Sequence, residues 1–321
     1  MRRRHALLAA VTLALPRLAG AQEAYPARQV RLVVPYPPGG TTDIMGRVVA
    51  QRLSDLWNQR VVVDNRVGAG GSIGTEFVAR AAPDGYTLVL GNSASHGANV
   101  LLSAAPTYDP VRDFAAISML AVVRQMLVVN NNVAVRSVQE LVTMAKTQPG
   151  RLSFSSSAVG GAPHLAGELF KLVAGVDLLH VPYNGAAPAL NALLAGDVTM
   201  LFGSVPTVAE LAKDGRLRAL AIASGSRSAL APTVPTMAEA GYAGVEMDSW
   251  NGLFAPAGTP PTVVAKVNTD LRRTLGNEEM TRRLGELGFE LGLSSPESLA
   301  THVGTEMVRI RRLITDARIT G

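Results

Sequence analysis

Two loops in the sequence combine glycines, hydroxyl side chains and the start of a helical pattern, which is chemistry suited to binding an anion. The first loop is residues 35–43, PYPPGGTTD. Gly39 and Gly40 have no side chain, so backbone N–H groups can approach a ligand, and the hydroxyl of Thr41 or Thr42 can cap the helix. The partial positive charge of a helix N-terminus favours an anion there. The alternative is that this loop is only a tight turn with an ordinary helix cap and binds no ligand.

The second loop is residues 155–164, SSSAVGGAPH. Its three hydroxyls, two glycines and a proline at the helix start again describe an anion-binding helix N-terminus. Ser156 and His164 could instead form a serine nucleophile and its base. The sequence lacks a G-x-S-x-G motif, and no acid is evident to orient the histidine, so binding is favoured over catalysis. His164 is expected to cap the helix, to hydrogen-bond or to contact a ligand.

Three further loops have a similar small and polar composition. Residues 68–74, GAGGSIG, superficially resemble a dinucleotide-binding fingerprint. The spacing is G-x-G-x-x-x-G and no clear ribose-binding acid ends the next apolar run, so a wall of a ligand cleft is preferred. Residues 183–188 (YNGAAP) and 203–207 (GSVPT) place a proline at a helix start and could line the same cleft.

These loops lack the side chains that most enzymes need. None contains Lys, Arg or Cys, a close pair of carboxylates, or histidines at metal-ligand spacing. The later histidines stand singly, at positions 96, 164, 180 and 302. The sequence therefore predicts no catalytic residue, no metal and no cofactor. What remains is reversible recognition of a small anion, which suits a carrier.

The loops are positioned by short β-branched runs that alternate with helical patterns of roughly 10 to 15 residues, which predicts an α/β fold with mainly parallel sheets. In such sheets ligands bind beyond the carboxyl ends of the strands, where these loops lie. We expect Leu53, Trp57 and Phe170 in the core. The expected strands are residues 30–34, 60–64, 86–90, 126–129, 152–155, 178–181, 198–202 and 218–223, and the expected helices are residues 42–57, 138–145, 164–173, 261–276 and 296–317.

Two passages suggest a division of the chain into two lobes. Residues 113–130 are two apolar segments joined at Arg124-Gln125, and residues 248–256 lead into a final helical section. A domain that is entered once and left once fits these passages. We therefore expect two discontinuous lobes joined by two crossing strands, with residues 26–123 and 250–321 in lobe 1 and residues 124–249 in lobe 2.

The first 21 residues predict a secretory signal that is cleaved after Ala21. Three arginines at positions 2–4 precede an apolar run, residues 6–15, which is too short to span a membrane. Removing four arginines and no acid lowers the formal net charge from +5 to +1, so the basic character does not predict a nucleic-acid partner. With no cysteine and 47% hydrophobic residues, we expect a globular, periplasmic protein that is stabilised by core burial and is not embedded in the membrane.

Motifs along most of the chain resemble the tripartite tricarboxylate transporter substrate-binding proteins, also called the Bug receptors. The motifs are PYPPGGTTD (35–43), GAGGSIGTEFVARAAPDGYTLVLG (68–91), YDPVRDF (108–114), SSSAVGGAPHLAGELF (155–170), HVPYNGAAPALNALLAGDV (180–198), PTVPTMAEAG (232–241) and FAPAGTPP (254–261). The resemblance implies a two-lobed type II periplasmic binding protein fold with a two-strand hinge. It also implies a cleft that closes on a small carboxylate and presents it to a membrane permease.

The resemblance further implies a binding site made by both lobes. Asp43 in that site could alternatively be only a cap of the first helical turn. The implied site residues are Pro37, Gly39, Gly40, Thr41, Asp43, Gly71 and Ser72 in lobe 1, and Ser155, Ser156, Ser157, His164, Asn184 and Ser204 in lobe 2.

Two positions depart from the family pattern. Asn184 stands where many relatives have Arg in VPYRG, and Gly203 stands where an acidic residue commonly follows the strand end. An acid at position 203 could meet an ammonium group of a ligand. Its absence favours a carboxylate without an amine.

Two other functions stay open. An exported sensor that signals ligand occupancy to a membrane partner would need the same closing cleft. An exported serine hydrolase would use Ser156 and His164, which the missing motif disfavours. A monomer is the default expectation for a receptor that diffuses.

Overall fold

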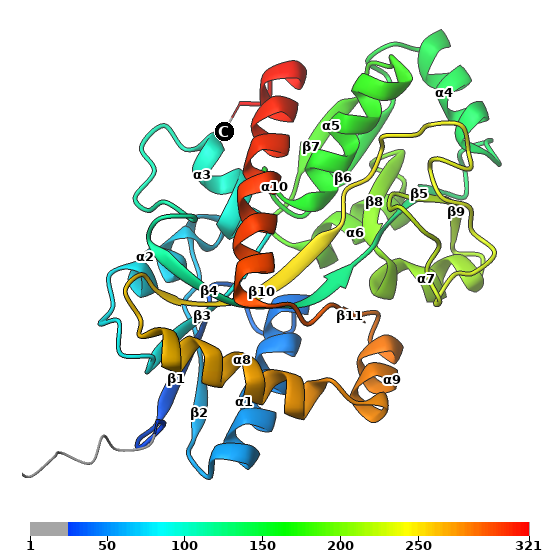
Figure 1. Ribbon diagram of the computed structural model, residues 1–321. Coiled ribbons are helices and arrows are strands. Elements are labelled where there is room, and N and C mark those ends of the chain that lie inside the picture. The colour runs from blue at the N-terminus through cyan, green and yellow to red at the C-terminus, as the bar shows by residue number, and fades with distance from the viewer. Residues whose placement is uncertain (1–24, 321) are drawn as a thin grey trace, which may run out of the picture.

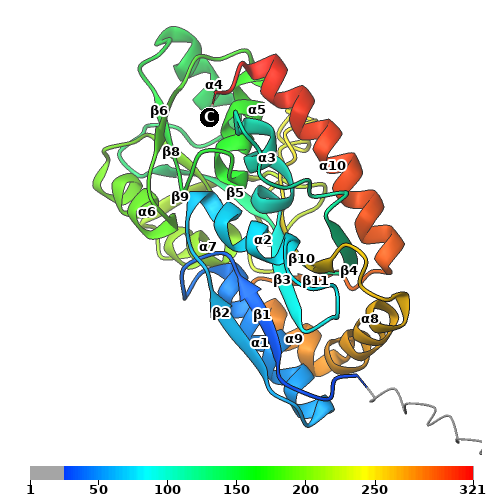
Figure 2. The same ribbon diagram turned by 90° about the vertical axis from the view of Figure 1, so that its left-hand side faces the viewer.

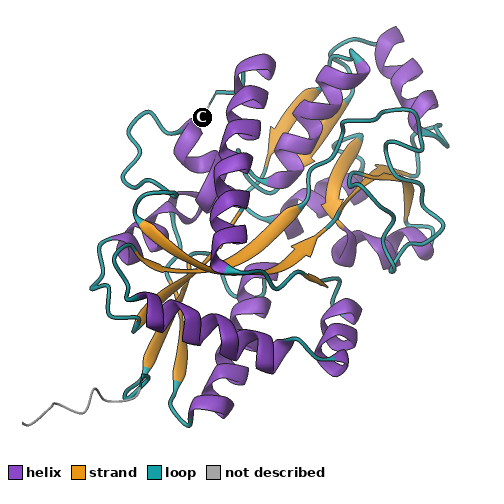
Figure 3. Ribbon diagram, in the orientation of Figure 1, coloured by secondary structure: helices purple, strands orange, loops and turns teal. Residues whose placement is uncertain are grey.

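Two open β-sheets form the framework of the protein, of which the computed structural model describes residues 25–320 (Figures 1 and 3). The predicted signal at residues 1–21 lies outside the described residues. The first sheet consists, in spatial order, of β11 (Glu290–Leu291), β4 (Phe114–Val123), β10 (Ser249–Pro256), β3 (Thr87–Asn92), β1 (Val30–Val34) and β2 (Val61–Asn65). The second sheet consists of β7 (Leu179–Pro182), β6 (Ser153–Ser156), β8 (Met200–Ser204), β5 (Gln125–Asn130) and β9 (Leu217–Ile222).

Helices cover both faces of the first sheet. They are α1 (Thr41–Trp57), α2 (Ser72–Ala79), α3 (Asn99–Leu102), α8 (Pro261–Leu275), α9 (Glu278–Glu286) and α10 (Pro296–Ala317), with short turns η1 (Ala69–Gly71) and η2 (Ala94–Ala98). Leu32 of β1 is buried in one cluster with residues of α1 and α8, whereas Val33 lies in another cluster with Leu299 of α10. Successive side chains of a strand point to opposite faces, so the apolar run VRLVV suits a strand that is covered on both sides.

The second sheet is covered in the same way. Its helices are α4 (Val138–Thr147), α5 (Ala162–Ala174), α6 (Ala186–Ala195) and α7 (Val205–Lys213). Phe154 and Phe202 lie in a buried cluster with residues of α4 and α5. Met126 and Leu201 lie in a separate cluster with residues of α6 and α7. Each helix therefore buries its apolar face against one side of the sheet.

Both sheets are mixed, which corrects the expectation of mainly parallel sheets. β1 is parallel to β2 and β3, and β6 is parallel to β7 and β8. By contrast, β10 is antiparallel to β3 and β4, β11 is antiparallel to β4, and β5 is antiparallel to β8 and β9. Most of these antiparallel pairs involve β5 and β10, the strands by which the chain enters the second sheet and returns from it. The strand–helix alternation that favours parallel pairing is interrupted there.

The chain passes between the sheets twice. Arg124 alone separates β4 from β5, and residues 223–248 connect β9 to β10. The proposed lobe boundaries, residues 26–123 with 250–321 and residues 124–249, stay a prediction.

Helix α10 runs alongside both sheets. Its Ile310 and Leu313 are buried in the same cluster as Phe154 of the second sheet, although its N-terminal part packs on the first sheet. Figure 2 shows the helix beside α3 and the α5 region. The two halves of the protein are therefore joined by packing as well as by the two crossings.

The predicted strands lie within two residues of observed ones, and the predicted helix at 296–317 coincides with α10. Strands β4, β10 and β11 were not among the predicted strands. Leu53 and Phe170 are fully buried as expected. Trp57 is only partly buried, because it lies at the end of α1, where its Nε1–H donates to Asp270 Oδ2 at 2.6 Å. No helix within residues 25–320 is both long and apolar enough to cross a bilayer.

Candidate functional site

The predicted loops follow strand ends that face one another. β1, β2 and β3 are parallel and β4 points the same way as β3, so all four end at the edge where Arg124 crosses to the second sheet. Gln125 at the start of β5 pairs antiparallel with Ser204 at the end of β8. The carboxyl ends of β6, β7 and β8 therefore point toward the first sheet (Figure 1). Ligand sites of open sheets lie beyond such ends.

The first loop leads into a helix N-terminus that has no side-chain cap. Gly40 is the N-cap residue of α1, with extended backbone, and no side chain accepts a hydrogen bond there. Gly39 has a φ of +87°, a conformation that favours glycine. Pro37, Gly39 and Gly40 are exposed and Thr41 is half-buried. Gly40, and not Thr41 or Thr42 as expected, therefore occupies the N-cap of α1, and the binding of an anion by the first N–H groups of α1 stays a prediction.

Asp43 is directed into this loop. Its side chain is 2% exposed, and its Oδ2 accepts from the Gly39 N–H and from Arg47 Nε, each at 2.9 Å. Its Oδ1 accepts from Asn65 Nδ2, also at 2.9 Å. Burial disfavours the charged form, but these hydrogen bonds outweigh it, so the pKa of Asp43 lies below its ordinary value. Asp43 therefore holds the turn that precedes α1, and its contact with a ligand stays a prediction.

A polar network behind the first loop was missed by sequence reasoning. The Tyr36 hydroxyl donates to Asn92 Oδ1 at 2.7 Å. Thr42 Oγ1 accepts from Asn92 Nδ2 at 3.3 Å and from Asn251 Nδ2 at 3.2 Å. These contacts tie α1 to β3 and to the returning strand β10. The only local signal that could have identified Asn92 as part of this network was its position at the end of a strand.

The loop of residues 68–74 packs against the first loop. A Cβ added to Gly71 would lie 2.9 Å from the Tyr36 hydroxyl oxygen, so this close approach requires glycine. Ser72 is half-buried at the start of α2. The Gly70 carbonyl accepts from Asn99 Nδ2 at 2.6 Å. The loop thus lies next to the first loop, and its contact with a ligand stays a prediction.

The second loop also leads into a helix without a side-chain cap, at Gly161 of α5. Its serines differ in accessibility. Ser155 and Ser156 are fully buried, and they donate to the carbonyls of Ala189 and Ala158, each at 3.1 Å. Ser157 is half-buried. Of the three hydroxyls predicted to bind a ligand, two are therefore used within the protein.

His164 and His180 form a pair, which corrects the expectation that the histidines stand singly. Their rings stack with centroids 3.9 Å apart and planes 16° apart. His180 Nε2 lies 2.7 Å from Ser156 Oγ, so Ser156 contacts His180 and not His164 as the hydrolase alternative required. Burial lowers the pKa of His164 to about 3 and that of His180 to about 4. Both rings are neutral at pH 7.

Asn184 and Ser204 lie on the remaining two loops. Asn184 is exposed between β7 and α6. The Gly185 N–H donates to the Ser157 carbonyl at 2.9 Å and joins this loop to the second loop. Ser204 Oγ lies 2.7 Å from Thr207 Oγ1 at the start of α7. In the described part of the chain, no group of three His, Cys, Asp or Glu side chains is placed to hold a metal ion.

The loops from the two sheets meet at Asn99. A Cβ added to Gly160 would lie 3.3 Å from Asn99 Oδ1 and 3.0 Å from Leu102 Cδ1. The same Asn99 side chain donates to Gly70, as described above. The loops of residues 68–74 and 155–164 therefore both lie against the side chain of this residue. Sequence reasoning did not identify Asn99, which follows η2 and belongs to no recognised motif.

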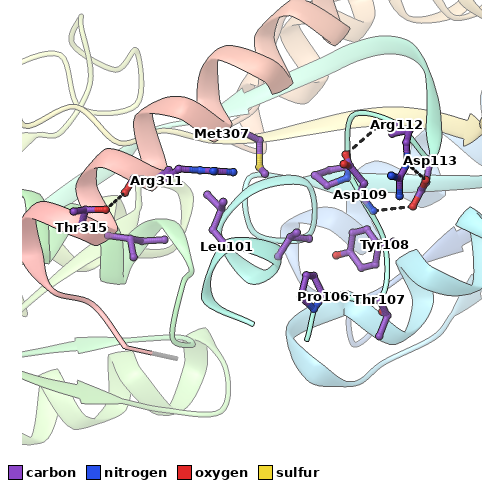
Figure 4. A pocket seen from close by; sticks show the side chains of 13 residues that line it. Leu101, Pro106, Thr107, Tyr108, Asp109, Arg112, Asp113, Met307, Arg311 and Thr315 are labelled. Atoms are coloured by element: carbon purple, nitrogen blue, oxygen red, sulfur yellow. Dashed lines mark hydrogen bonds and ion pairs between the residues drawn. The ribbon is translucent and has the colours of Figure 1, made fainter. Parts of the chain in front are cut away.

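A groove of about 620 Å³ lies between α10 and the segment that leads to β4 (Figure 4). Met307 and Arg311 line it from α10, and Tyr108 and Arg112 line it from the other side. A smaller cavity of about 310 Å³ lies beside Trp57. None of the predicted ligand-binding residues lines either cavity.

The chain has clear relatives. Residues 45–319 match the family described as the tripartite tricarboxylate transporter family receptor. Protein BugT of Bordetella pertussis is 38% identical over 289 residues, which cover 89% of this chain and 88% of BugT. The structure of R. palustris Rpa4515 with adipate has a TM-score of 0.85 and 38% identity, and the match covers 92% of this chain and 99% of that one. MatC from Rhodopseudomonas palustris, with bound malate, has a TM-score of 0.81 and 31% identity, covering 90% of this chain and 100% of MatC.

Proposed function

The chain belongs to the tripartite tricarboxylate transporter receptor family, and on this premise we propose that it is a periplasmic receptor that captures a small carboxylate between its two lobes and delivers it to the membrane permease of the transporter. The cleavable signal predicted at residues 1–21 supports export. The relatives whose structures contain adipate and malate support a carboxylate as the ligand.

The observation that carries the proposal is the pair of helix N-termini at α1 and α5. Both begin at a glycine without a side-chain cap, at strand ends that face one another. Their N–H groups and helix dipoles favour a negative group. The two loops contain no Lys or Arg, so the ligand is held by partial charges and hydrogen bonds and can be released.

The proposed activity is binding and not catalysis. Ser156, the candidate nucleophile, is buried and donates its hydroxyl hydrogen to the Ala158 carbonyl. Thr41 and Ser157 are the half-buried hydroxyls next to the two helix N-termini. We assign them to the ligand in place of the fully buried serines.

The first experiment measures binding by the mature protein, residues 22–321. Adipate and malate are titrated by isothermal calorimetry, with adipamide as a neutral analogue of the same length. Saturable binding of at least one dicarboxylate, with none of the diamide, is expected because helix N-termini favour a negative charge. Equal binding of adipate and adipamide would contradict the proposal. So would the absence of binding to any member of a wider carboxylate panel, together with no carboxylate in native mass spectra of the purified protein.

The second experiment tests the site with the double variant Thr41→Ala/Ser157→Ala. Loss of two hydrogen bonds to a charged group is expected to weaken binding of the tighter dicarboxylate by at least about tenfold. The matched control is Ser298→Ala/Thr301→Ala, which removes two exposed hydroxyls from α10. An equal affinity for the two double variants would show that the ligand lies elsewhere.

A further inference from the structure

The second loop is attached to two stacked imidazoles from different elements. His164 lies in the first turn of α5 and His180 lies in β7, 16 residues later. Phe154 also stacks on His180, with ring centroids 4.8 Å apart. The His164 side chain is 5% exposed. Both rings are therefore held by packing among β6, α5 and β7. The loop of residues 157–161 lies between β6 and α5 and belongs to neither element.

The hydrogen bonds determine which ring nitrogen carries the proton. His164 Nδ1 accepts from the Gly160 N–H at 3.0 Å, so its proton is on Nε2. Ser156 Oγ uses its single hydrogen on the Ala158 carbonyl, at 3.1 Å. The Nε2–H tautomer of His180, whose Nε2 lies 2.7 Å from that oxygen, allows Ser156 to keep both contacts. We therefore assign a neutral ring with the proton on Nε2 to both histidines.

The pair thus holds the loop at both ends. His180 fixes Ser156, whose hydroxyl holds the Ala158 carbonyl, and His164 holds the Gly160 N–H. Gly160 has a φ of +77° and lies against Asn99, so its position also determines how the second loop meets the other half of the protein.

We propose that His164 and His180 act together as positioning residues, which hold residues 157–161 in the conformation that presents the N-terminus of α5 to the carboxylate. This inference rests on the proposed function. The pair touches the loop and not the ligand, which distinguishes it from the direct contact that sequence reasoning assigned to His164.

Burial and nearby charges keep both rings neutral. Burial is the largest cause that lowers the pKa of each ring, and Lys171 lowers both further, with His180 also lowering the pKa of His164. Glu168 Oε1 lies 3.9 Å from His164 Nε2, but Glu168 is already paired with Lys171 at 2.9 Å. Protonation of His164 would replace the acceptor of the Gly160 N–H by a second donor. The attachment of the loop is therefore expected to persist through the pH range in which exposed histidines titrate and to fail only in stronger acid.

The first test is independent of any ligand. Nitrogen-15 NMR of histidine-labelled protein distinguishes the two tautomers, and His164→Asn and His180→Gln variants assign the signals. Both rings are expected to carry the proton on Nε2 and to show no titration between pH 8 and pH 5. A proton on Nδ1 of His164, or titration of either ring near the ordinary pKa of about 6.5, would overturn the proposal.

The second test compares variants that remove the hydrogen bond with variants that restore it. His164→Ala and His180→Ala are expected to weaken adipate binding by about tenfold, the equivalent of one lost hydrogen bond. His164→Asn and His180→Gln place an acceptor and a donor near the original nitrogens, and we expect affinities within about threefold of the wild type. His302→Gln, in α10, is the control that should leave binding unchanged.

Hydrogen exchange of the Gly160 amide completes the test. It should be faster in the two Ala variants and close to the wild-type rate in the Asn and Gln variants. If all four variants match the wild type in exchange and in adipate affinity, the histidines do not position the loop. If the wild-type protein binds no carboxylate of the panel, the ligand assignment fails, while the tautomers and the exchange rates still decide whether the pair holds the loop.

Discussion

Asn65 Nδ2 donates a hydrogen bond of 2.9 Å to Asp43 Oδ1 and so joins the end of β2 to the first turn of α1, which follows the parallel strand β1. The same Asn65 amide donates to the Tyr36 carbonyl at 3.0 Å. Asp43 in turn holds the Gly39 N–H. The turn that exposes the α1 N-terminus is therefore fixed by contacts within the protein, which lowers the ordering cost of binding.

Replacing Asp43 tests this arrangement. Asp43→Ala would leave the Gly39 N–H, the Asn65 amide and Arg47 without their common acceptor, and we expect a loss of about 2–3 kcal/mol in the free energy of unfolding. Urea denaturation at pH 7 measures it. Asp55→Ala, an exposed carboxylate on the same helix, is the control, with a loss below about 0.5 kcal/mol expected. Similar losses in both variants would show that Asp43 does not brace the loop.

Two helical glycines should respond in opposite directions to the same substitution. A Cβ at Gly167 of α5 would lie 2.2 Å from Phe154 Cε2, so Gly167→Ala is expected to destabilise by about 1–3 kcal/mol through overpacking. A Cβ at Gly304 of α10 would have no neighbouring atom within 4 Å, and Gly304→Ala should stabilise by about 0.5–1 kcal/mol because alanine favours the helix. Thermal and urea unfolding measure both changes. If the two substitutions changed the stability in the same direction, this account of α5 packing would be contradicted.

Asp248, just before β10, should make stability depend on pH. Burial raises its pKa to about 6, although Ser224 Oγ donates to its Oδ2 at 2.7 Å and Arg124 lies nearby. The unfolded carboxyl ionises near pH 4, so between about pH 4 and 6 the folded protein binds more protons and loses stability as pH rises. Asp248→Asn removes this loss, and its stability relative to the wild type should be about 2 kcal/mol greater at pH 7.5 than at pH 4.

The measurement is urea unfolding of the wild type and the Asp248→Asn variant at both pH values. Asp197→Asn, which changes an exposed carboxylate, should show no such pH-dependent difference. A constant offset between Asp248→Asn and the wild type would exclude a raised pKa at this position.

Arg124 connects both crossings between the sheets. Its guanidinium pairs with Glu290 of β11 and donates to Ser224 Oγ at 2.6 Å and to the Ser226 carbonyl at 2.8 Å. Arg124→Ala should cost about 1–3 kcal/mol, since several charge-assisted hydrogen bonds are lost together. Arg282→Ala breaks an exposed pair with Glu286 and should cost less than about 1 kcal/mol. Chemical denaturation of the two variants measures both losses in the free energy of unfolding. An equal loss in the two variants would refute the larger role of Arg124.

Local sequence signals predicted the parts of the fold that depend on near neighbours. The run VRLVV specified a buried strand, and the loop compositions before α1 and α5 indicated helix starts, although Gly40 and not the expected Thr41 or Thr42 occupies the N-cap of α1. Antiparallel pairing of β10 was not predictable in this way. It depends on where the chain returns to the first sheet, about 125 residues after leaving it, and no local periodicity records that.

The candidate loops were identified from the sequence, but their supporting contacts were not. The two loops follow from glycine and hydroxyl composition. The partner of Thr42, Asn251, lies 209 residues away, and the partner of Ser156, His180, lies 24 residues away on another strand. Asparagine and histidine are common in ordinary loops, so only the folded arrangement distinguishes these residues from others of their type.

The packing of α10 limits how this protein can be divided. Ile310 and Leu313 complete the apolar interior that surrounds Phe154, so a gene fragment encoding only residues 124–249 would leave part of that interior facing water. A minimal biosensor built from this chain has to retain the C-terminal helix, even if its purpose requires only the half that contains the stacked histidines.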